Sequence, residues 1–187
     1  PEMSRGLGDV YKRQPLYVPK RGIQMITENS KIENTVIFSD DNTHRYLLSR
    51  IWNTSKEVPL FITKTAGQAN GVLLDLTTNI ISSNLYKLGY GVFYAVNLCS
   101  AIDSKAEQLY DKDTDIIIKK YLKSVNEVII AWGTLTNKTL KKREEYVLDM
   151  LHKSNKKLFC VTDNLGHMNV HPLTPSVRKD FYIAEFK

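Results

Sequence analysis

From about residue 35 onward, short apolar runs alternate with segments in which apolar residues recur every three or four positions. The runs that are apolar nearly throughout, and are expected as buried strands, are residues 59–63, 91–98, 127–132 and 157–162. The segments with helical spacing, and expected as helices, are residues 76–88, 113–123 and 139–153. Buried strands that alternate with helices of this length predict a parallel sheet covered by helices on both faces.

Both ends of this pattern predict further strands. Residues 35–39 and 45–52 are rich in strand-forming residues and flank the turn cluster at residues 40–42. This arrangement predicts a small β-hairpin ahead of the main sheet. The C-terminal residues 180–186 are expected as an edge strand.

The predicted organisation has three parts. Residues 35–187 form one three-layer α/β/α domain with a mostly parallel central sheet, and residues 15–34 form an N-terminal extension. The segment Ser4–Gln14 can be back-translated into a DNA sequence that is similar to a transposon-based sequencing adapter. Residues 1–14 are therefore interpreted as a non-native segment, and their glycines and basic residues are not taken as a phosphate-binding loop.

Composition narrows the class of protein. The chain has 187 residues, of which 42% are hydrophobic and 25% charged, as is typical of one globular domain. No run of about 18 apolar residues predicts a membrane span. The two cysteines, Cys99 and Cys160, are too few for a disulfide framework; they are interpreted as buried apolar residues of a cytoplasmic protein. The formal charge of +6 is compatible with DNA as a partner. A monomer is expected, without membrane association or a protein partner.

The predicted sheet indicates where a site should lie. In open sheets with parallel strands, ligands bind outside the carboxyl ends of the strands. The loops that follow the predicted strands are residues 64–75, 97–105, 133–138 and 163–175. These loops are rich in Thr, Asn, Asp, Ser and His side chains, so the functional site is expected there.

Few sequence motifs point to one chemistry. His167 and His171 have the spacing of half a zinc site, but the chain lacks further ligands at suitable spacing, so no metal and no cofactor is predicted. The sequence contains no Walker loop, no strand-linked G-x-G-x-x-G and no G-x-S-x-G. Asp75 is interpreted as a helix N-cap, with a functional carboxylate as the alternative. His171 is either a structural hydrogen-bonding residue or a site residue. The charge run at residues 141–145 is interpreted as a solvated helix face.

Several short motifs, weak when taken singly, occur together in a familiar order. They are RYLLSRIW at 45–52, ANGVLLDLTT at 69–78, LGYG at 88–91, VNL at 96–98, AWG at 131–133 and GHMNVHPL at 166–173. Over about residues 44–173 the chain thus resembles the bacterial family called domain of unknown function 1643. The name of that family does not imply a function.

A more distant resemblance is to the uracil-DNA glycosylase superfamily. The shared order is a polar loop after the first core strand, an Asn-Leu pair ending the next, a strand ending near a glycine, and a late His-Pro pair. The resemblance implies that Thr65 positions water, that His171 contacts the oxygen of the departing base, and that Asn97 occupies the strand end. Members of the superfamily usually have N-P-S-T-A-D where this chain has TAGQAN. Because a threonine hydroxyl is a poor base, Asn70 or Asp75 is the alternative for water activation.

The chemistry of such a reaction suits these side chains. Breaking an N-glycosidic bond leaves negative charge on the base, which a neutral imidazole and fixed amide dipoles can stabilise. A base that leaves the helix stack enters a pocket lined by aromatic and amide groups. The residues expected around the base are Gln68, Tyr90, Asn97, Trp132 and His167, with core packing as the alternative for the two aromatic residues. The residues expected to line one cleft at the strand ends are Thr65, Asn70, Asp75, Asn97 and His171.

The function expected from the resemblance is that of a DNA base-excision glycosylase, acting on a damaged or modified base, with defence against phage as a further expectation. The alternative is a non-catalytic nucleic-acid or nucleotide-binding protein on the same fold. A small-molecule hydrolase or transferase using the same cleft is a third class.

Overall fold

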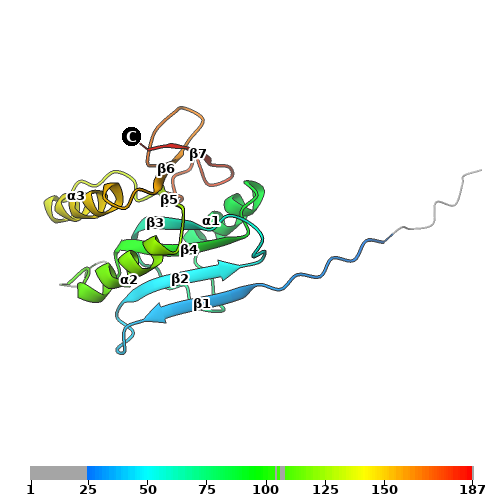
Figure 1. Cartoon of the computed structure of the whole chain (residues 1–187), viewed down its shortest axis with the longest axis horizontal. Helices are drawn as coiled ribbons and strands as arrows, with labels where there is room; N and C mark the ends of the chain where they lie inside the picture. Colours follow the sequence, from blue (N-terminus) through cyan, green and yellow to red (C-terminus); the bar gives the residue numbers. More distant parts are fainter. Residues whose placement is uncertain (1–24, 104, 106–107, 187) are drawn as a thin grey trace, which may run out of the picture.

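The computed structural model describes residues 25–103, 105 and 108–186, and these residues are built around one seven-stranded sheet with three helices (Figure 1). The strands are β1 (Glu33–Phe38), β2 (Arg45–Ile51), β3 (Pro59–Thr65), β4 (Val92–Cys99), β5 (Glu127–Ile130), β6 (Lys157–Thr162) and β7 (Tyr182–Glu185). The helices are α1 (Leu76–Lys87), α2 (Lys112–Lys123) and α3 (Lys138–His152). The predicted mixed α/β class is confirmed.

The sheet has a parallel centre and antiparallel flanks. Its strand order is β1-β2-β4-β3-β5-β6-β7, and the four neighbours β4, β3, β5 and β6 are parallel. In this register Thr65 at the end of β3 pairs with Cys99 at the end of β4, and Ile130 at the end of β5 pairs with Cys160. The carboxyl ends of the central strands therefore lie at one edge of the sheet.

The predicted hairpin exists, but it is not a separate unit ahead of the sheet. Strands β1 and β2 pair antiparallel, β2 pairs antiparallel with β4, and β7 pairs antiparallel with β6. Parallel pairing is thus confined to the centre, and the expectation of a mostly parallel sheet is corrected to a mixed one. The reason lies in β2: Leu47 and Leu48 point to opposite faces, and each is only 1% exposed. A strand that is apolar on both sides needs the main core on both sides.

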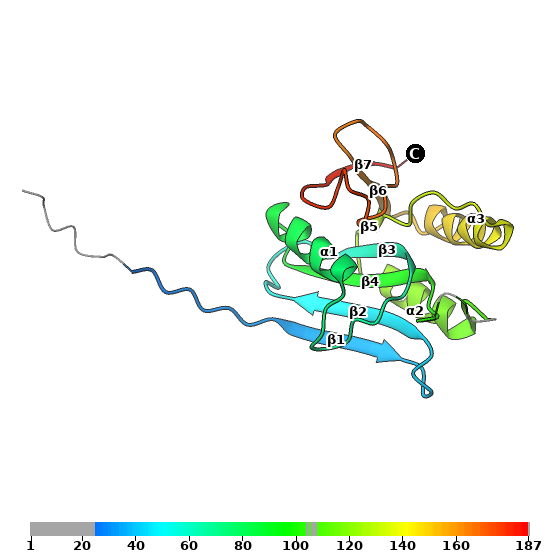
Figure 2. The same ribbon diagram turned by 180° about the vertical axis from the view of Figure 1, so that it is seen from behind.

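The helices lie on both faces of the sheet (Figure 2). On one face, α1 and the segment after β6 cover a core that includes Phe61, Phe93 and Phe181. On the other face, α2 and α3 cover a core that includes Ile62 and Trp132. Each face of the parallel centre is therefore buried, as the continuous apolar strands predict.

The helix ends show which local signals act. Asp75 is the N-cap of α1, since its carboxylate accepts from the Thr78 N–H at 2.7 Å, and Gly89 follows the helix with φ +88°. Neither Asp113 nor Thr114, at the start of the helical spacing, is the N-cap of α2. Asp111 is the cap, because it accepts from the Thr114 N–H at 2.9 Å while the Thr114 hydroxyl accepts from the Asp111 N–H.

Helix α3 corrects one expectation about its faces. Tyr146 of this helix is 46% exposed. Arg143, expected on a solvated face, is 1% exposed and forms an ion pair of 2.6 Å with Asp115 of α2. A run of alternating charge does not reveal which of its members has an ionic partner on a neighbouring helix.

Residues 25–32 are exposed and carry no regular secondary structure (Figure 1). The adapter-like residues 1–14 lie outside the described residues. Within the described part of the chain, no helix is long and apolar enough to cross a membrane.

Candidate functional site

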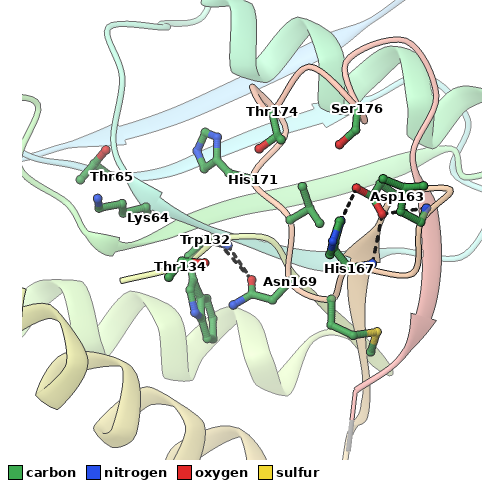
Figure 3. A pocket seen from close by; sticks show the side chains of 14 residues that line it. Lys64, Thr65, Trp132, Thr134, Asp163, His167, Asn169, His171, Thr174 and Ser176 are labelled. Atoms are coloured by element: carbon green, nitrogen blue, oxygen red, sulfur yellow. Dashed lines mark hydrogen bonds and ion pairs between the residues drawn. The ribbon is translucent and has the colours of Figure 1, made fainter. Parts of the chain in front are cut away.

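A pocket of about 860 Å³ lies where the central strands end (Figure 3). It is formed by the end of β3, the segment after β5 and the long connection between β6 and β7. The lining residues are Lys64, Thr65, Trp132, Gly133, Thr134, Asp163, Leu165, His167, Met168, Asn169, Val170, His171, Thr174 and Ser176. This is the edge of the sheet at which the parallel strands predict a ligand.

His171 is held in one neutral form. Its Nδ1 accepts a hydrogen bond of 3.1 Å from the Leu173 N–H, so the proton of the neutral ring is on Nε2. Burial, together with the positive charge of Lys64, lowers the pKa of His171. The turn is closed by the Thr174 N–H, which donates to the His171 carbonyl at 2.8 Å. His171 is therefore a neutral hydrogen-bond donor in the pocket at neutral pH.

The close approach of this loop to the end of β5 depends on Gly133. Gly133 has φ +72°, and a Cβ at this position would lie 3.1 Å from the Cβ of His171. A larger residue would be strained by its backbone conformation and would also press on the histidine. The glycine of the AWG motif thus permits the contact that positions His171.

Asn169 joins the same two segments. Its Oδ1 accepts from the N–H groups of Trp132 and Gly133 at 3.0 and 3.3 Å, and its own φ is +53°, a conformation that asparagine tolerates. These bonds use the carbonyl oxygen of the amide and leave its NH₂ group without a partner among the described residues, in a side chain that belongs to the pocket lining (Figure 3). Beyond β5, the Ala131 N–H still donates to the Ile62 carbonyl at 2.9 Å, whereas the next two amides, those of Trp132 and Gly133, pair with the Asn169 side chain.

Asp163 and His167 form a second polar unit of the pocket. The Asp163 carboxylate accepts from His167 Nδ1 at 2.8 Å and from the N–H groups of Leu165 and His167, both at 3.0 Å. These hydrogen bonds, that of the His167 ring first, lower the pKa of Asp163 to about 2. The Asp163 side chain is 3% exposed, whereas that of His167 is 68% exposed. The carboxylate is therefore ionised at neutral pH and holds an accessible imidazole.

The end of β3 supplies Lys64 and Thr65. Asn97 of β4 stabilises the end of β3, because its Nδ2 donates to the Thr63 hydroxyl and, at 3.0 Å, to the Thr65 carbonyl. Asn97 is 3% exposed and does not line the pocket. Its observed contacts are those of a residue that positions Thr65, in place of the base contact expected for it.

Other expected site residues lie outside the pocket lining. Asp75 caps α1 and lies 3.7 Å from the Arg45 guanidinium. Asn70 accepts from the N–H groups of Val72 and Leu73 at 2.9 and 2.8 Å and so stabilises its own turn. Gln68, in the same connection, is exposed. The expectation of one cleft shared by five residues is therefore correct only for Thr65 and His171.

The two aromatic residues expected near a base have other environments. Tyr90 precedes β4 and lies at the opposite edge of the sheet, where burial and a hydrogen bond with Glu127 raise its pKa. The Trp132 side chain is 1% exposed, and its indole Nε1 donates to Glu144 of α3 at 2.6 Å. The core-packing alternative holds for Trp132, and Tyr90 takes no part in the pocket.

The residues described here contain no group of three or more His, Cys, Asp or Glu side chains arranged to hold a metal. The Nδ1 atoms of His167 and His171 are both engaged, with Asp163 and with the Leu173 N–H. Cys99 and Cys160 are buried, which raises the pKa of each thiol and leaves neither activated as a nucleophile.

Lys64, Asp163 and Asn169 were missed as site residues by sequence reasoning. Lys64 lies next to Thr65 on a strand end, and the other two are polar residues of the loop after β6. That position was the only available signal, and it applied equally to many neighbouring side chains.

The fold and this pocket define an α/β protein with a hydrogen-bonding site at the carboxyl ends of its parallel strands. The chain matches the family described as "Protein of unknown function (DUF1643)" over residues 45–173, and it belongs to that family. The match extends from β2 to the loop that carries His171. No curated protein and no solved structure matches the chain.

Proposed function

We propose that this protein hydrolyses the N-glycosidic bond of a damaged or modified base in DNA, with the base bound in the pocket described above. The observation that carries the proposal is the state of His171. Its Nδ1 is occupied by the Leu173 N–H, so a neutral ring offers Nε2–H to a ligand. A neutral donor of this kind can stabilise an oxygen that gains negative charge, without transferring a proton to it.

The proposed reaction requires little else of the protein. Water attacks the C1′ carbon of the sugar, the C1′–N bond breaks with its electron pair remaining on the base, and one proton of the attacking water is released. The negative charge spreads to a carbonyl oxygen of the base, where His171 Nε2–H donates to it. Thr65 lines the same pocket as His171 and is the residue proposed to orient the water.

The polarity of the pocket supports a ligand rich in carbonyl oxygens. Lys64, Asn169 and His171 each bring N–H donors to the lining. The carboxylate of Asp163, which also belongs to the lining, is already engaged by three N–H groups. A pocket of about 860 Å³ has room for a base with its sugar and an attacking water. Under this proposal, the parallel centre with helices on both faces corresponds to the glycosylase-like three-layer arrangement.

One observation favours a second candidate, a non-catalytic nucleic-acid or nucleotide-binding protein on the same fold. Asp75, a carboxylate expected as an alternative for activating water, is occupied by the N-terminus of α1 and by Arg45. A pocket that binds a base but activates no water would bind DNA without cutting the glycosidic bond.

An abasic-site assay on the full chain distinguishes the two functions. Single- and double-stranded DNA carrying uracil, thymine mismatches or modified cytosines is incubated with the protein, and alkali-labile breaks are counted. We expect breaks with at least one of these bases. His171→Ala should slow single-turnover cleavage by about 10²- to 10³-fold, the usual effect of losing one such donor.

His152→Ala is the matched control, because His152 is exposed on α3 and lies outside this pocket. It should retain the wild-type rate. Retention of DNA without any breaks would favour the binding protein. Full activity of a folded His171→Ala variant would contradict the proposed role of this histidine.

A further inference from the structure

The pair Asp163–His167 is built like a catalytic dyad. Asp163 follows β6 directly, and three N–H groups hold its side chain, those of Leu165, His167 and the His167 ring. The carboxylate is 3% exposed, whereas the imidazole that it holds is 68% exposed. The buried carboxylate therefore fixes the orientation of the imidazole, while the ring remains accessible to a ligand.

This contact determines which nitrogen of His167 carries the proton. An ionised carboxylate can only accept, so His167 Nδ1 must donate to Asp163 Oδ2 across their 2.8 Å contact. In the neutral ring the lone pair is then on Nε2. His171 has the opposite form, because its Nδ1 accepts from the Leu173 N–H. Two histidines of one pocket, four positions apart, thus offer a base and a donor.

We propose that His167 Nε2 is the general base that takes the proton from the attacking water, an inference that rests on the proposed glycosidic-bond hydrolysis. The oxygen of the water forms the new bond to C1′, and one water proton moves to His167 Nε2. The electron pair of the breaking C1′–N bond moves to the base, whose oxygen accepts from His171 Nε2–H. The proton then leaves the His167 imidazolium for the departing base or for solvent.

In this scheme Asp163 is a positioning residue. It holds the Nδ1–H form of His167 and stabilises the imidazolium that forms when Nε2 is protonated. The scheme also supplies the base that the other candidates do not provide: the Thr65 hydroxyl is a poor base, and Asp75 is engaged with α1 and Arg45. The charged and titratable groups that share the lining with His167 are Asp163, Lys64 and His171.

Kinetics on the full chain test the role of His167. In single-turnover cleavage of whichever DNA substrate the wild type cleaves, His167→Gln should be slower by about 10²- to 10⁴-fold. The wild-type rate should fall on acidification, as Nε2 becomes protonated, and the variant should lose this dependence. His152→Ala should keep both the rate and the pH profile of the wild type. A residue that only stabilised the turn would change the melting temperature and leave the pH profile of the folded protein unchanged.

Asp163→Asn provides a second test. An asparagine NH₂ group facing Nδ1 would force the proton of His167 onto Nε2, which removes the basic lone pair, so a loss of about 10²- to 10⁴-fold is expected. Nitrogen-15 spectra of the histidine rings report the form of each ring directly. We expect Nδ1–H for His167 and Nε2–H for His171 in the wild type, and Nε2–H for His167 in Asp163→Asn.

The outcomes separate the two proposals. The general-base role of His167 is supported if the wild type forms breaks and if His167→Gln is slow and lacks the dependence on acid pH. If His167→Gln keeps the rate and the pH profile of the wild type, or if His167 of the wild type carries its proton on Nε2, His167 is not the general base. The proposed glycosylase activity is not affected by either result. If the wild-type protein breaks none of the DNA substrates, both the proposed function and the general-base role of His167 are overturned.

Discussion

Two polar clusters, one within the connection between β6 and β7 and the other assembled from residues far apart in the sequence, differ in where their hydrogen-bonding groups point. The pocket cluster consists of Asp163, His167, Asn169 and His171. The Arg143 cluster consists of Leu98, Tyr110, Asp115 and Arg143. In the second, Arg143 donates from Nε to the Leu98 carbonyl at 2.9 Å, pairs with Asp115 at 2.6 Å and lies over the Tyr110 ring at 4.1 Å.

The contacts of the Arg143 cluster serve stability, whereas those of the pocket cluster leave polar groups for function. Arg143 is 1% exposed, and the contacts described for its charged group are with the protein itself. In the pocket cluster, Asn169 and His171 each use one polar atom to hold the loop and leave another for the pocket. Substitutions in the Arg143 cluster should therefore affect folding, and those in the pocket cluster should affect activity more than folding.

The largest effect on stability is expected from Arg143→Ala. The substitution removes the ion pair, the hydrogen bond to Leu98 and the packing on Tyr110. It should lower the free energy of unfolding by about 3 kcal/mol, near the lower end for a buried pair, because Asp115 is 23% exposed and can be hydrated. Urea unfolding gives the value, and activity per folded molecule should be unchanged.

Lys142→Ala is the control for this prediction, because Lys142 is the exposed neighbour of Arg143 on α3. It should change the unfolding free energy by less than about 0.5 kcal/mol. If both variants were equally stable, the Arg143 cluster would have no special role in folding.

Substitutions of Asn169 should have an intermediate effect on stability. They also compare, within one side chain, the role of Oδ1 in stability with the role of the NH₂ group in activity. Asn169→Ala leaves the N–H groups of Trp132 and Gly133 without their acceptor, at a cost of about 1–3 kcal/mol. Asn169→Asp keeps an acceptor but loses the NH₂ group that the Oδ1 bonds leave unpaired. The aspartate variant should regain much of the stability and little of the activity. Recovery of both in thermal unfolding and cleavage assays would mean that the amide donor serves no ligand.

The smallest effect is a dependence of stability on pH. The pKa of Asp163 is about 2, below its ordinary value of 3.8, so its ionised form stabilises the folded state. This contribution is fully present above about pH 4 and is lost as the pH falls toward 2. The difference in melting temperature between the wild type and Asp163→Asn should shrink as the pH falls from 4 to 2. A difference that stayed constant from pH 4 to pH 2 would contradict the role of this carboxylate.

Much of the fold was predictable from local sequence. The apolar runs predict the central strands, because a strand that is buried on both faces is apolar throughout. The helical spacing predicts the three helices, because each helix is buried on one face. The rule for parallel sheets then predicts the edge at which the pocket lies, with Thr65 and His171 in it. The family match from residue 45 to residue 173 agrees with the motifs along that stretch.

The sequence by itself thus determined the elements, their class and the edge of the sheet that holds the pocket. Only the tertiary structure decided which atoms of the loops meet. Asn169 reaches Trp132 across 37 positions, and Arg143 reaches Leu98 across 45. Such contacts depend on strand order and loop path, which no local pattern encodes. Asp75 illustrates the limit, since its position before a helix allows both a cap and a catalytic carboxylate, and its bond to the Thr78 N–H at 2.7 Å makes it the cap.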